Sequence, residues 1–504
     1  MELFATFLLT TFILLSLRLA GKHFSDPLKW FPGPKLAKWT RLYRFYYDSI
    51  VGGGWLRHLQ ELHEEYGPVV RVGYNELHFA DPNAYADIYS SPTKLPKEPR
   101  LYATFELGLP PNVFSTVDPK EHSVMKSMLG SFFSRQGVLK LEHVIQERVD
   151  KLISQLVKNH KSTSANMNCA FRSVTLDVII LYVLRTNLDA TSFPSFNHPA
   201  IHATDTANAQ VYALRHTLWL GRTLNYLPRW LVLLLAPSSR PILEVKGQVE
   251  DLVDAALKDS HNPEYDPNSG PERNVFHTLI SNARSEEMTT TRVTRDWLIC
   301  TAGTLHVAGS DTVGNACTIG SRCLIRDDRV RTKLVQELET AWPDKESPMP
   351  LERLEKLPYL TAVIKESLRL SHGVVSPMQR VVPDSGAVIV GHSVPPGTIV
   401  STANSFVHMN PDVFPEPESF CPERWLEDKD RTLDRYLVSF GKGPRSCLGI
   451  NLAWCELYLI MGNVFRKLNL SSDSDLWSEV CFKEVFVPVY EGDVLSATAE
   501  ERRS

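Results

Sequence analysis

The stretch SFGKGPRSCLG, residues 439–449, holds a single cysteine, Cys447, in a loop bent by glycines and a proline. Residues 448–466 have the apolar spacing of a helix, which places Cys447 at the helix N-terminus. Backbone N–H groups point outward there and lower the pKa of a thiol. A cysteine that only fills a core needs none of these neighbours, so the loop indicates a thiolate held for a metal.

The neighbours of Cys447 suit a haem iron. Phe440 can cover the sulfur, and Arg445 can neutralise an anionic group on the same side. A hydrogen-bonded thiolate in a low-polarity site pushes electron density toward oxygen on such an iron and favours O–O cleavage. Glycines lack a Cβ and let the backbone approach a flat group, and the loop contains three, Gly441, Gly443 and Gly449. The alternative is an inert, buried cysteine on a turn.

The spacing Phe440-x-x-Gly443-x-Arg445-x-Cys447-x-Gly449 resembles the haem-binding signature of the cytochrome P450 family at every defined position. The resemblance runs from the Pro-Gly-Pro segment near residue 33 to the C-terminal strands. It implies that Cys447 is the axial ligand of the iron of haem b. It also implies that the other four residues of the signature hold the cofactor.

A second motif of the family involves an ion-pair triad. Glu366 and Arg369, in IKESLRL, lie three residues apart and share one helical face. The segment FCPERW supplies Arg424 downstream. The resemblance implies that these three residues form a structural triad that holds the haem-side core. The alternative is an exposed ion pair, which contributes little to stability.

A third motif, HVAGSDTVGN, lies in a predicted long helix. Ala308, Gly309, Asp311 and Thr312 match the oxygen-binding stretch of the same family. The resemblance implies that Ala308 and Gly309 allow close approach of haem and O₂. An acid beside an alcohol can relay protons, so Asp311 and Thr312 are the predicted catalytic pair. The alternative is that Thr312 bonds back to the i−4 carbonyl and that Asp311 sits in a solvated groove.

The haem propionates require cations. Arg445 is one candidate, and Arg380, in SPMQRVVP, stands where the family carries another. His122 and Lys126 lie four residues apart on one predicted helix face, in place of the aromatic or histidine plus arginine that is usual in the family. Lysine is a point charge whereas arginine is a fork, so this departure weakens the expected contact. A surface position for His122 is the alternative.

Composition excludes several classes of protein. The chain has 504 residues, 54 basic and 58 acidic, and a formal charge of −4, so no electrostatic footprint for nucleic acid is present. The eight cysteines form no CxxC pair and no disulfide framework, which fits a reducing compartment. Helical spacing dominates, over residues 55–66, 122–157, 171–184, 244–258, 293–326, 328–342 and 358–370. We therefore expect a mainly α fold with small β-sheets, as the cytochrome P450 resemblance implies.

The N-terminus predicts a membrane anchor. Residues 3–20 are apolar and uncharged up to Arg18, which is long enough as a helix for a thin bilayer core. Basic residues follow the segment, which keeps the body cytosolic. A cleaved signal peptide is the alternative. The predicted domains are a transmembrane anchor at 1–21, a basic Pro-Gly-Pro hinge at 22–38 and a haem-thiolate catalytic domain at 39–504, on the endoplasmic reticulum membrane.

The resemblance implies monooxygenation with electrons from NADPH. No GxGxxG unit and no flavin domain are found in the chain, and Ser446 stands where the cysteine loop would need a third glycine. A separate NADPH–cytochrome P450 reductase is therefore expected as a partner, with cytochrome b5 as an optional second donor. Lys442, beside the cysteine loop, is a candidate contact for the reductase.

The substrate is expected to be a hydrophobic small molecule of terpenoid, polyketide or steroid type, because the segments that line the site in the family are largely apolar here. These segments are 100–119, parts of 203–240, 374–377 and 485–488. Residues 31–55 resemble fungal microsomal members near the trichodiene oxygenases, which suggests secondary metabolism. Two alternatives remain open, namely a haem-thiolate isomerase or dehydratase that activates no O₂, and a haem-binding sensor or carrier.

Overall fold

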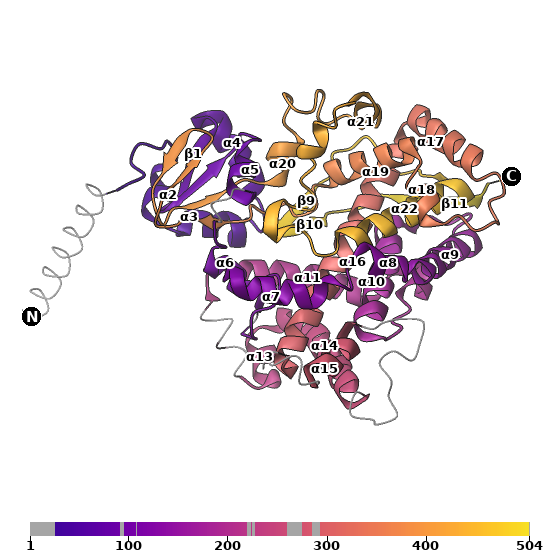
Figure 1. The fold of residues 1–504 in the computed structure, drawn as a ribbon, viewed down its shortest axis with the longest axis horizontal. Coiled ribbons are helices and arrows are strands. Elements are labelled where there is room, and N and C mark those ends of the chain that lie inside the picture. Colours follow the sequence, from indigo (N-terminus) through magenta and orange to yellow (C-terminus); the bar gives the residue numbers. More distant parts are fainter. Residues whose placement is uncertain are drawn as a thin grey trace, which may run out of the picture.

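The computed structural model describes residues 26–90, 95–106, 108–218, 223, 227–259, 275–284 and 293–502, without the side chains of 210–214 and 281–284. Helices dominate and four small sheets accompany them, as predicted. In Figure 1 the N-terminal helices and much of the sheet structure lie on the left, and most of the other helices lie in the centre and on the right. The helix α16, Arg295–Arg326, runs through the middle of the molecule.

The α-helices among the described residues fall into an N-terminal, a central and a C-terminal group. They are α2 Lys35–Trp39, α3 Leu42–Phe45, α4 Trp55–Tyr66, α5 Ala84–Tyr89, α6 Pro99–Ala103, α7 Pro119–Gly130, α8 Arg135–Leu139, α9 Glu142–Asn159, α10 Met167–Leu184, α11 Pro199–Leu214, α13 Arg229–Leu235, α14 Arg240–Asp259, α15 Val275–Arg284, α16, α17 Asp328–Ala341, α18 Leu351–Leu354, α19 Pro358–Ser371, α20 Asn404–His408, α21 Glu423–Glu427 and α22 Ile450–Lys467. One π-helical turn, η1 Tyr46–Ile50, follows α3, and short 3₁₀ turns include η2 Thr104–Glu106, η3 Ala190–Ser192, η4 Pro194–Phe196, η5 Pro237–Ser239, η6 Leu433–Arg435 and η7 Gly443–Arg445.

The strands form one four-stranded sheet and three smaller ones. The four-stranded sheet has the order β1-β2-β7-β4, in which β2 pairs with β7 in parallel and the other pairs are antiparallel. The remaining orders are β10-β9, β3-β11-β8 and β5-β6. The bounds are β1 Val69–Gly73, β2 Glu76–Phe79, β3 Ala165–Asn166, β4 Arg380–Val381, β5 Ala387–Ile389, β6 His392–Val394, β7 Ile399–Ser401, β8 Leu468–Ser471, β9 Phe482–Val485, β10 Val487–Tyr490 and β11 Ser496–Glu501.

The predicted helix over residues 122–157 is wrong in one respect, because the chain breaks there into α7, α8 and α9. Asp118 starts α7 by accepting from the backbone N–H groups of Lys120 and Glu121. Ser134 starts α8 by accepting from the N–H of Gly137. A Cβ at Gly137 would lie 2.3 Å from the carbonyl oxygen of Phe132, so the chain turns back closely on itself. The capping side chains divide into separate helices a stretch whose apolar periodicity alone predicts one continuous helix.

The core is built around the contact between α10 and α16. A Cβ at Gly309 would lie 2.6 Å from the side chain of Ile179, and one at Gly314 would lie 2.5 Å from the side chain of Arg172. Two glycines of α16 therefore let α10 approach closely, and this approach encloses an arginine between the helices. The arrangement places the predicted oxygen-binding stretch next to a buried charge.

The predicted anchor at residues 1–21 lies outside the described residues. Among the residues that the structure describes, one helix, α10, is long enough and apolar enough to span a bilayer, and 89% of it is buried inside the protein. A buried core helix meets the same criteria of length and composition. All eight cysteines lie within the described residues, and all are free, as predicted from their spacing.

Candidate functional site

The cysteine loop adopts the geometry that its sequence predicts. The short turn η7 precedes Cys447, and α22 begins three residues after it. The N–H of Cys447 donates to the carbonyl oxygen of Phe440 at 2.8 Å, which closes the loop on itself. The backbone N–H of Gly449 donates to the sulfur. The sulfur thus lies at a helix N-terminus, where N–H groups stabilise negative charge.

The Cys447 sulfur faces a hollow inside the protein. The residue is exposed by surface area, yet burial among surrounding atoms raises the pKa of its thiol, against the opposing effects of the Gly449 N–H and Lys126. Both observations hold where a side chain borders a space that protein atoms surround. A Cβ at Gly449 would also meet nothing within 4 Å. A metal cation would stabilise a thiolate here, and the donor set fits the iron of a haem.

Two residues of the signature have roles that their spacing did not reveal. Gly443 has a φ of +70°, and a Cβ there would lie 2.3 Å from the carbonyl oxygen of Tyr89. This glycine therefore lets the loop pack against the end of α5 instead of against a flat ligand. Phe440 is partly buried, and its ring lies 6.0 Å from that of Trp454.

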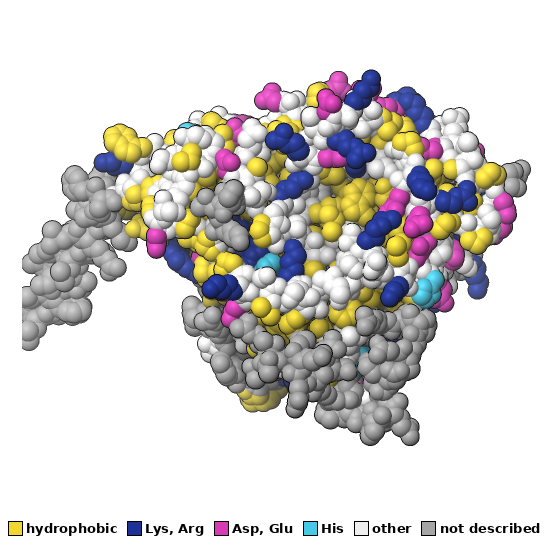
Figure 2. All heavy atoms as spheres, in the orientation of Figure 1, with side chains coloured by type: hydrophobic (Ala, Val, Ile, Leu, Met, Phe, Trp, Pro, Cys, Tyr) yellow, Lys and Arg dark blue, Asp and Glu magenta, His cyan; other side chains and the backbone are white. Residues whose placement is uncertain are grey.

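The four predicted propionate residues lie together. Arg380, Arg445, His122 and Lys126 all line one pocket of about 440 Å³ between α5, α7 and the cysteine loop, and none of the described residues that line it is acidic. Figure 2 shows lysine, arginine and histidine side chains gathered in the hollow over α7. A pocket with several cations and no carboxylate suits an anionic ligand such as two propionate groups. The predicted grouping is thus present, and the contact with haem stays a prediction.

A further cation, Lys97, lies close to the cations of this pocket and was missed by sequence reasoning. It is buried, its ammonium donates to the carbonyl oxygen of Phe114, and it lies 4.2 Å from the ring centroid of Tyr102. Burial and the charges of Arg380 and Arg445 lower its pKa well below the usual value. The only signal was a lysine between an apolar residue and a proline-started helix, in LPKEP.

The cations of this pocket destabilise one another. Burial and the charge of Arg380 lower the pKa of Arg445 to about 10. Burial and the neighbouring cations Arg445, Lys97 and Lys126 lower the pKa of His122 to about 3. His122 is therefore a neutral hydrogen-bond donor here, and it is buried instead of lying on the surface. An anion in the pocket would relieve the repulsion, which supports its assignment to carboxylate groups.

The triad of Glu366, Arg369 and Arg424 forms as the resemblance implies. Arg369 holds both carboxylate oxygens of Glu366, at 2.7 and 3.0 Å, and the Nε of Arg424 reaches one of them at 3.2 Å. The indole N–H of Trp425 and the backbone N–H of Cys421 also donate to Glu366. Both Glu366 and Arg369 are fully buried. The alternative of an exposed ion pair is excluded.

Replacing Glu366 with glutamine should prevent stable folding around haem. The change leaves the fully buried guanidinium of Arg369 and the partly buried one of Arg424 without their carboxylate, and breaking a buried pair costs about 3–5 kcal/mol. The thermal unfolding midpoint and the haem content after purification would measure the loss. The matched control is Glu355→Gln, which breaks the more exposed ion pair with Arg135 (2.7 Å) and is expected to cost about 0–1 kcal/mol. Equal losses in both variants would contradict the structural role of the triad.

One face of α16 borders open space. Ala308 is exposed. Thr312 lies one turn after Ala308 on the same face, and its hydroxyl donates to the Ala308 carbonyl oxygen at 3.1 Å. This hydrogen bond to the i−4 carbonyl is the alternative role that the sequence allowed for Thr312. Gly309, by contrast, points its missing Cβ at α10, so its close approach is to another helix and not to a bound ligand.

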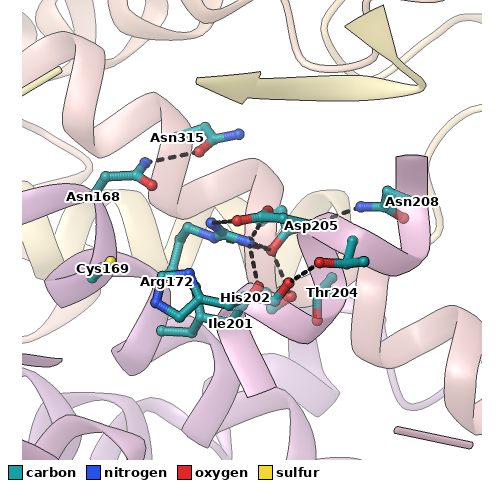
Figure 3. A network of polar contacts seen from close by, with 12 residues as sticks. Asn168, Cys169, Arg172, Ile201, His202, Thr204, Asp205, Asn208 and Asn315 are labelled. Carbon is teal, nitrogen blue, oxygen red and sulfur yellow. Dashed lines mark hydrogen bonds and ion pairs between the residues drawn. The ribbon is translucent and has the colours of Figure 1, made fainter. Parts of the chain in front are cut away.

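Asp311 is buried and not in a solvated groove, and it is hydrogen-bonded to residues of α10 and α11. Figure 3 shows a polar network in which Arg172 of α10 lies at the centre. One oxygen of Asp311 accepts from Arg172 at 2.8 and 3.1 Å, and the other accepts from Asn208 at 3.3 Å. Arg172 also binds Asp205 of α11 through two hydrogen bonds, at 2.7 and 3.1 Å. The predicted acid and alcohol are neighbours in sequence, and the acid is bound to other partners.

Two carboxylates, one buried and one partly exposed, thus share the buried guanidinium of Arg172. Burial lowers the pKa of Arg172, but the charges and hydrogen bonds of Asp311 and Asp205 outweigh it and keep that pKa above its usual value, so the guanidinium stays charged. The pKa of Asp205 is raised, because burial and the nearby Asp311 outweigh the attraction of Arg172. The side chain of Asp205 is 25% exposed and that of Asp311 is 3% exposed. The signal that could have revealed Arg172 is a lone arginine within an otherwise apolar helix.

Three of the four predicted lining segments meet at Phe486. The rings of Phe105 and Phe114 lie 4.7 and 5.5 Å from that of Phe486. The backbone N–H groups of Val375 and Ser376 donate to its carbonyl oxygen at 3.0 and 3.3 Å. Its φ of +84° is a strained value for a bulky residue, and it makes the tight turn between β9 and β10. Segments 100–119, 374–377 and 485–488 therefore lie together. We call the three rings of Phe105, Phe114 and Phe486 the aromatic wall.

A buried acid, Glu484, stands two residues before this wall. Its carboxylate accepts from the backbone N–H of Leu56 at 2.5 Å, and burial raises its pKa from 4.5 to about 8. Asp48 raises the pKa further, whereas Arg44 and Ser376 lower it. The folded state therefore binds this proton more tightly than the unfolded state does.

The stability of the protein should accordingly fall as the pH rises from 5 to 8. Below pH 4.5 both states are protonated and the contribution of Glu484 is fully present; it is lost as the pH passes through the folded-state pKa. Glu484→Gln keeps the shape of the side chain and cannot ionise, so this part of the pH slope should disappear. Unfolding midpoints measured from pH 5 to 9 would show it. The same slope in the variant would mean that other groups cause it.

The family comparison agrees with this geometry. A family model described as Cytochrome P450 matches residues 32–494 of the chain. The matched region contains the cysteine loop, the triad and the open face of α16. Among the described residues, no cluster of three histidine, cysteine, aspartate or glutamate side chains is placed to hold a metal ion.

Individual relatives are fungal. The chain is 33% identical over 469 residues to a cytochrome P450 monooxygenase, aflU, of Aspergillus parasiticus, covering 92% of this chain and 91% of the relative. It is 33% identical over 449 residues to the conidiogenone synthase of Penicillium rubens, with 88% of each chain covered. It is 34% identical over 466 residues to the tryptophan 6-hydroxylase of Fusarium equiseti, covering 91% of this chain and 89% of the relative.

Proposed function

Because this chain belongs to the cytochrome P450 family, we propose that it is a haem-thiolate monooxygenase that oxidises an apolar, ring-containing metabolite in a fungal biosynthetic pathway. Monooxygenation places one atom of O₂ in the substrate and releases the other as water. The electrons come from NADPH through a reductase. The observation that carries the proposal is the cysteine at a helix N-terminus beside a pocket of cations that lacks carboxylates among its described lining residues.

Each part of the site has a role in this proposal. The haem supplies the iron chemistry that activates O₂ and transfers oxygen. Cys447 is the iron ligand, and the hydrogen bond from Gly449 tunes its sulfur. Arg380, Arg445 and Lys126, with His122 as a neutral donor, bind the propionates. Thr312, on the open face of α16, and the buried Asp311, which Arg172 holds in place, handle protons.

The substrate class rests on the aromatic wall. Phe105, Phe114 and Phe486 present ring faces and edges, which favour an apolar substrate with a flat or polycyclic body. A terpenoid or polyketide fits this description. The names of relatives at 33% and 34% identity are a conidiogenone synthase and a tryptophan 6-hydroxylase, so overall identity does not select one substrate. The wall residues are the better guide to it.

The redox partner is an NADPH–cytochrome P450 reductase, with cytochrome b5 as an optional second donor. Figure 2 shows lysine and arginine side chains around an apolar hollow on the face drawn there, which suits a partner with an acidic surface. Lys442 is a weaker candidate contact than its position suggested. Its ammonium donates to the carbonyl oxygen of Asp434 at 3.0 Å and it is partly buried, so it is less available to a partner.

The proposed location is the endoplasmic reticulum membrane, with the catalytic domain on the cytosolic side. The apolar segment at residues 3–20 supports an anchor. The surface of α13 supports a second contact, because Trp230, Leu234 and Leu235 are 67%, 70% and 63% exposed. A short helix with several large exposed apolar side chains is typical of a segment that rests on a lipid surface.

Charged residues on α13 should weaken binding to membranes. In a chain that lacks residues 1–21, Trp230→Glu with Leu234→Glu is expected to lower the affinity for phospholipid vesicles at least about tenfold, since each side chain loses its apolar burial. Vesicle flotation would measure it. The control is Trp477→Glu, which changes a 77% exposed tryptophan elsewhere on the protein. The same affinity in the α13 variant and the unmodified chain would exclude the contact.

The proposed function is tested by reconstitution. The full chain, a fungal reductase, NADPH and a panel of terpenoid and polyketide precursors should give products that gain one oxygen atom from ¹⁸O₂, as read by mass spectrometry. A rearranged product without ¹⁸O and without NADPH use would indicate the isomerase or dehydratase alternative. Haem binding without turnover of any panel member would favour the sensor or carrier alternative.

A further inference from the structure

Asn112 is a fully buried side chain between α6 and α7 whose two ends bind two different parts of the protein. Its amide nitrogen donates to the hydroxyl of Thr304 at 2.7 Å and to the sulfur of Cys300 at 3.2 Å, both on α16. Its amide oxygen accepts from the backbone N–H groups of Phe114 and Ser115 at 2.8 and 3.1 Å. One side chain therefore shapes its own loop and attaches that loop to α16.

The point of attachment on α16 is the open face that borders the reaction site. Thr304 precedes Ala308 by four residues and Thr312 by eight, so the three residues share one helical face. Ala308 on this face is exposed. Asn112 therefore attaches its loop two turns from the hydroxyl that the monooxygenation requires.

The rest of the loop, residues 113–118, is held from the cofactor side. Lys97 donates to the carbonyl oxygen of Phe114. Arg445 donates to the carbonyl oxygens of Thr116 and Val117 at 2.7 and 2.9 Å. Arg445 stands two residues before Cys447. The loop thus spans from the open face of α16 to the cysteine loop, with Asn112 as its attachment to the helix.

Phe114 carries this loop into the aromatic wall. Its ring lies 5.2 Å from that of Phe105, 5.5 Å from that of Phe486 and 5.5 Å from that of Tyr102. Phe114 is two residues from Asn112, and its backbone N–H is bound by the Asn112 side chain. A shift of the loop relative to α16 would therefore move a ring of the wall relative to the reaction site.

We propose that Asn112 is a positioning residue for the reaction, which fixes the aromatic wall relative to the open face of α16 and so determines which bond of the substrate is presented for oxidation. The oxygen of its amide shapes the loop, and the nitrogen sets the distance between the loop and α16. The residue touches neither substrate nor cofactor in this arrangement. It acts through Phe114, so its loss changes selectivity more than it changes haem binding.

The two functions of the amide can be separated by substitution. Asn112→Asp keeps an oxygen for the N–H groups of Phe114 and Ser115, but replaces the nitrogen that donates to α16. Thr304→Val removes the partner hydroxyl from the other side and leaves Asn112 intact. Asn463→Asp is the matched control, because Asn463 is also fully buried and its amide nitrogen donates to Leu459 and Gln146, remote in sequence from the wall.

The probes are 1-phenylimidazole and 4-phenylimidazole, two isomers that bind a haem iron through nitrogen and direct the same phenyl ring differently. Optical difference spectra of the full-length haem protein give a dissociation constant for each. The ratio of the two constants measures the position of the wall and does not require an identified substrate. The reduced, CO-bound spectrum of each variant first verifies that the haem is held by a thiolate.

The expected result is a change of about fivefold or more in this ratio in both Asn112→Asp and Thr304→Val, which corresponds to the loss of about one hydrogen bond. The double variant should change the ratio no further than the larger single one, because both substitutions break the same contact. Asn463→Asp should leave the ratio as in the wild type. A wild-type ratio in Thr304→Val, or an equal change in Asn463→Asp, would overturn the proposal. If Asn112→Asp fails to retain haem, Thr304→Val alone decides.

Discussion

Replacing Cys447 with alanine is expected to remove the red-shifted absorption band of the reduced, CO-bound protein entirely. A thiolate ligand is what shifts this band, and Cys447 is the cysteine that combines a helix N-terminus, a donor N–H and an internal hollow. The remaining cysteines on helices lie in α10, α16 and α22, and burial raises the pKa of Cys317 and Cys455, which keeps these thiols protonated. They are typical of inert core thiols.

The control for this experiment is Cys481→Ala, which removes an exposed cysteine outside the loop. This variant should keep the wild-type spectrum and the wild-type haem content. Cys447→Ala should also lose monooxygenase turnover, since the electron density of the thiolate is required for O–O cleavage. A wild-type spectrum in Cys447→Ala would mean that another residue holds the iron, and the proposed roles of Phe440 and Gly449 would then be wrong as well.

The parts of the site that could be predicted from the sequence are those with a local cause. The cysteine loop, the N-terminus of α22 and the pair Glu366 and Arg369 are each encoded within a few residues. Their geometry follows from glycine conformations, a helix end and the three-residue spacing on one helix face. The propionate pocket gathers residues from α7, β4 and the loop, and the family resemblance was needed to bring them together.

The parts that were missed depend on contacts between distant segments. Arg172 lies 139 positions before Asp311, and only the close packing of α10 on α16 at Gly314 brings them into contact. The same packing explains Gly309, which has no Cβ and so lets α10 approach α16 closely. Asn112 lies 192 positions before Thr304. No periodicity or motif in one sequence indicates such pairs, because each depends on how whole helices pack.

The arrangement of Asp311 leads to the second large effect, that of Asp311→Asn. Proton transfer by a positioned acid contributes about 10²- to 10⁴-fold to a rate, so turnover should fall at least about 100-fold. The haem spectrum should be retained, and the solvent isotope effect on turnover should rise, because the remaining proton path runs through water alone. The rate of NADPH oxidation in H₂O and in D₂O, with the first substrate that shifts the haem spin state, measures both quantities.

Asp205→Asn is the matched control, and it distinguishes a proton-transfer role from a structural one. Asp205 binds the same guanidinium of Arg172 through two hydrogen bonds, but it belongs to α11 and is not adjacent to Thr312. If the network only stabilises the fold, the two variants should lose similar stability and similar activity. If Asp311 delivers protons, Asp205→Asn should retain turnover within about threefold, since Asp205 is more exposed than Asp311 and its ion pair contributes less. Equal losses of turnover would show that Arg172 and its two carboxylates serve the fold and that the protons arrive by another route.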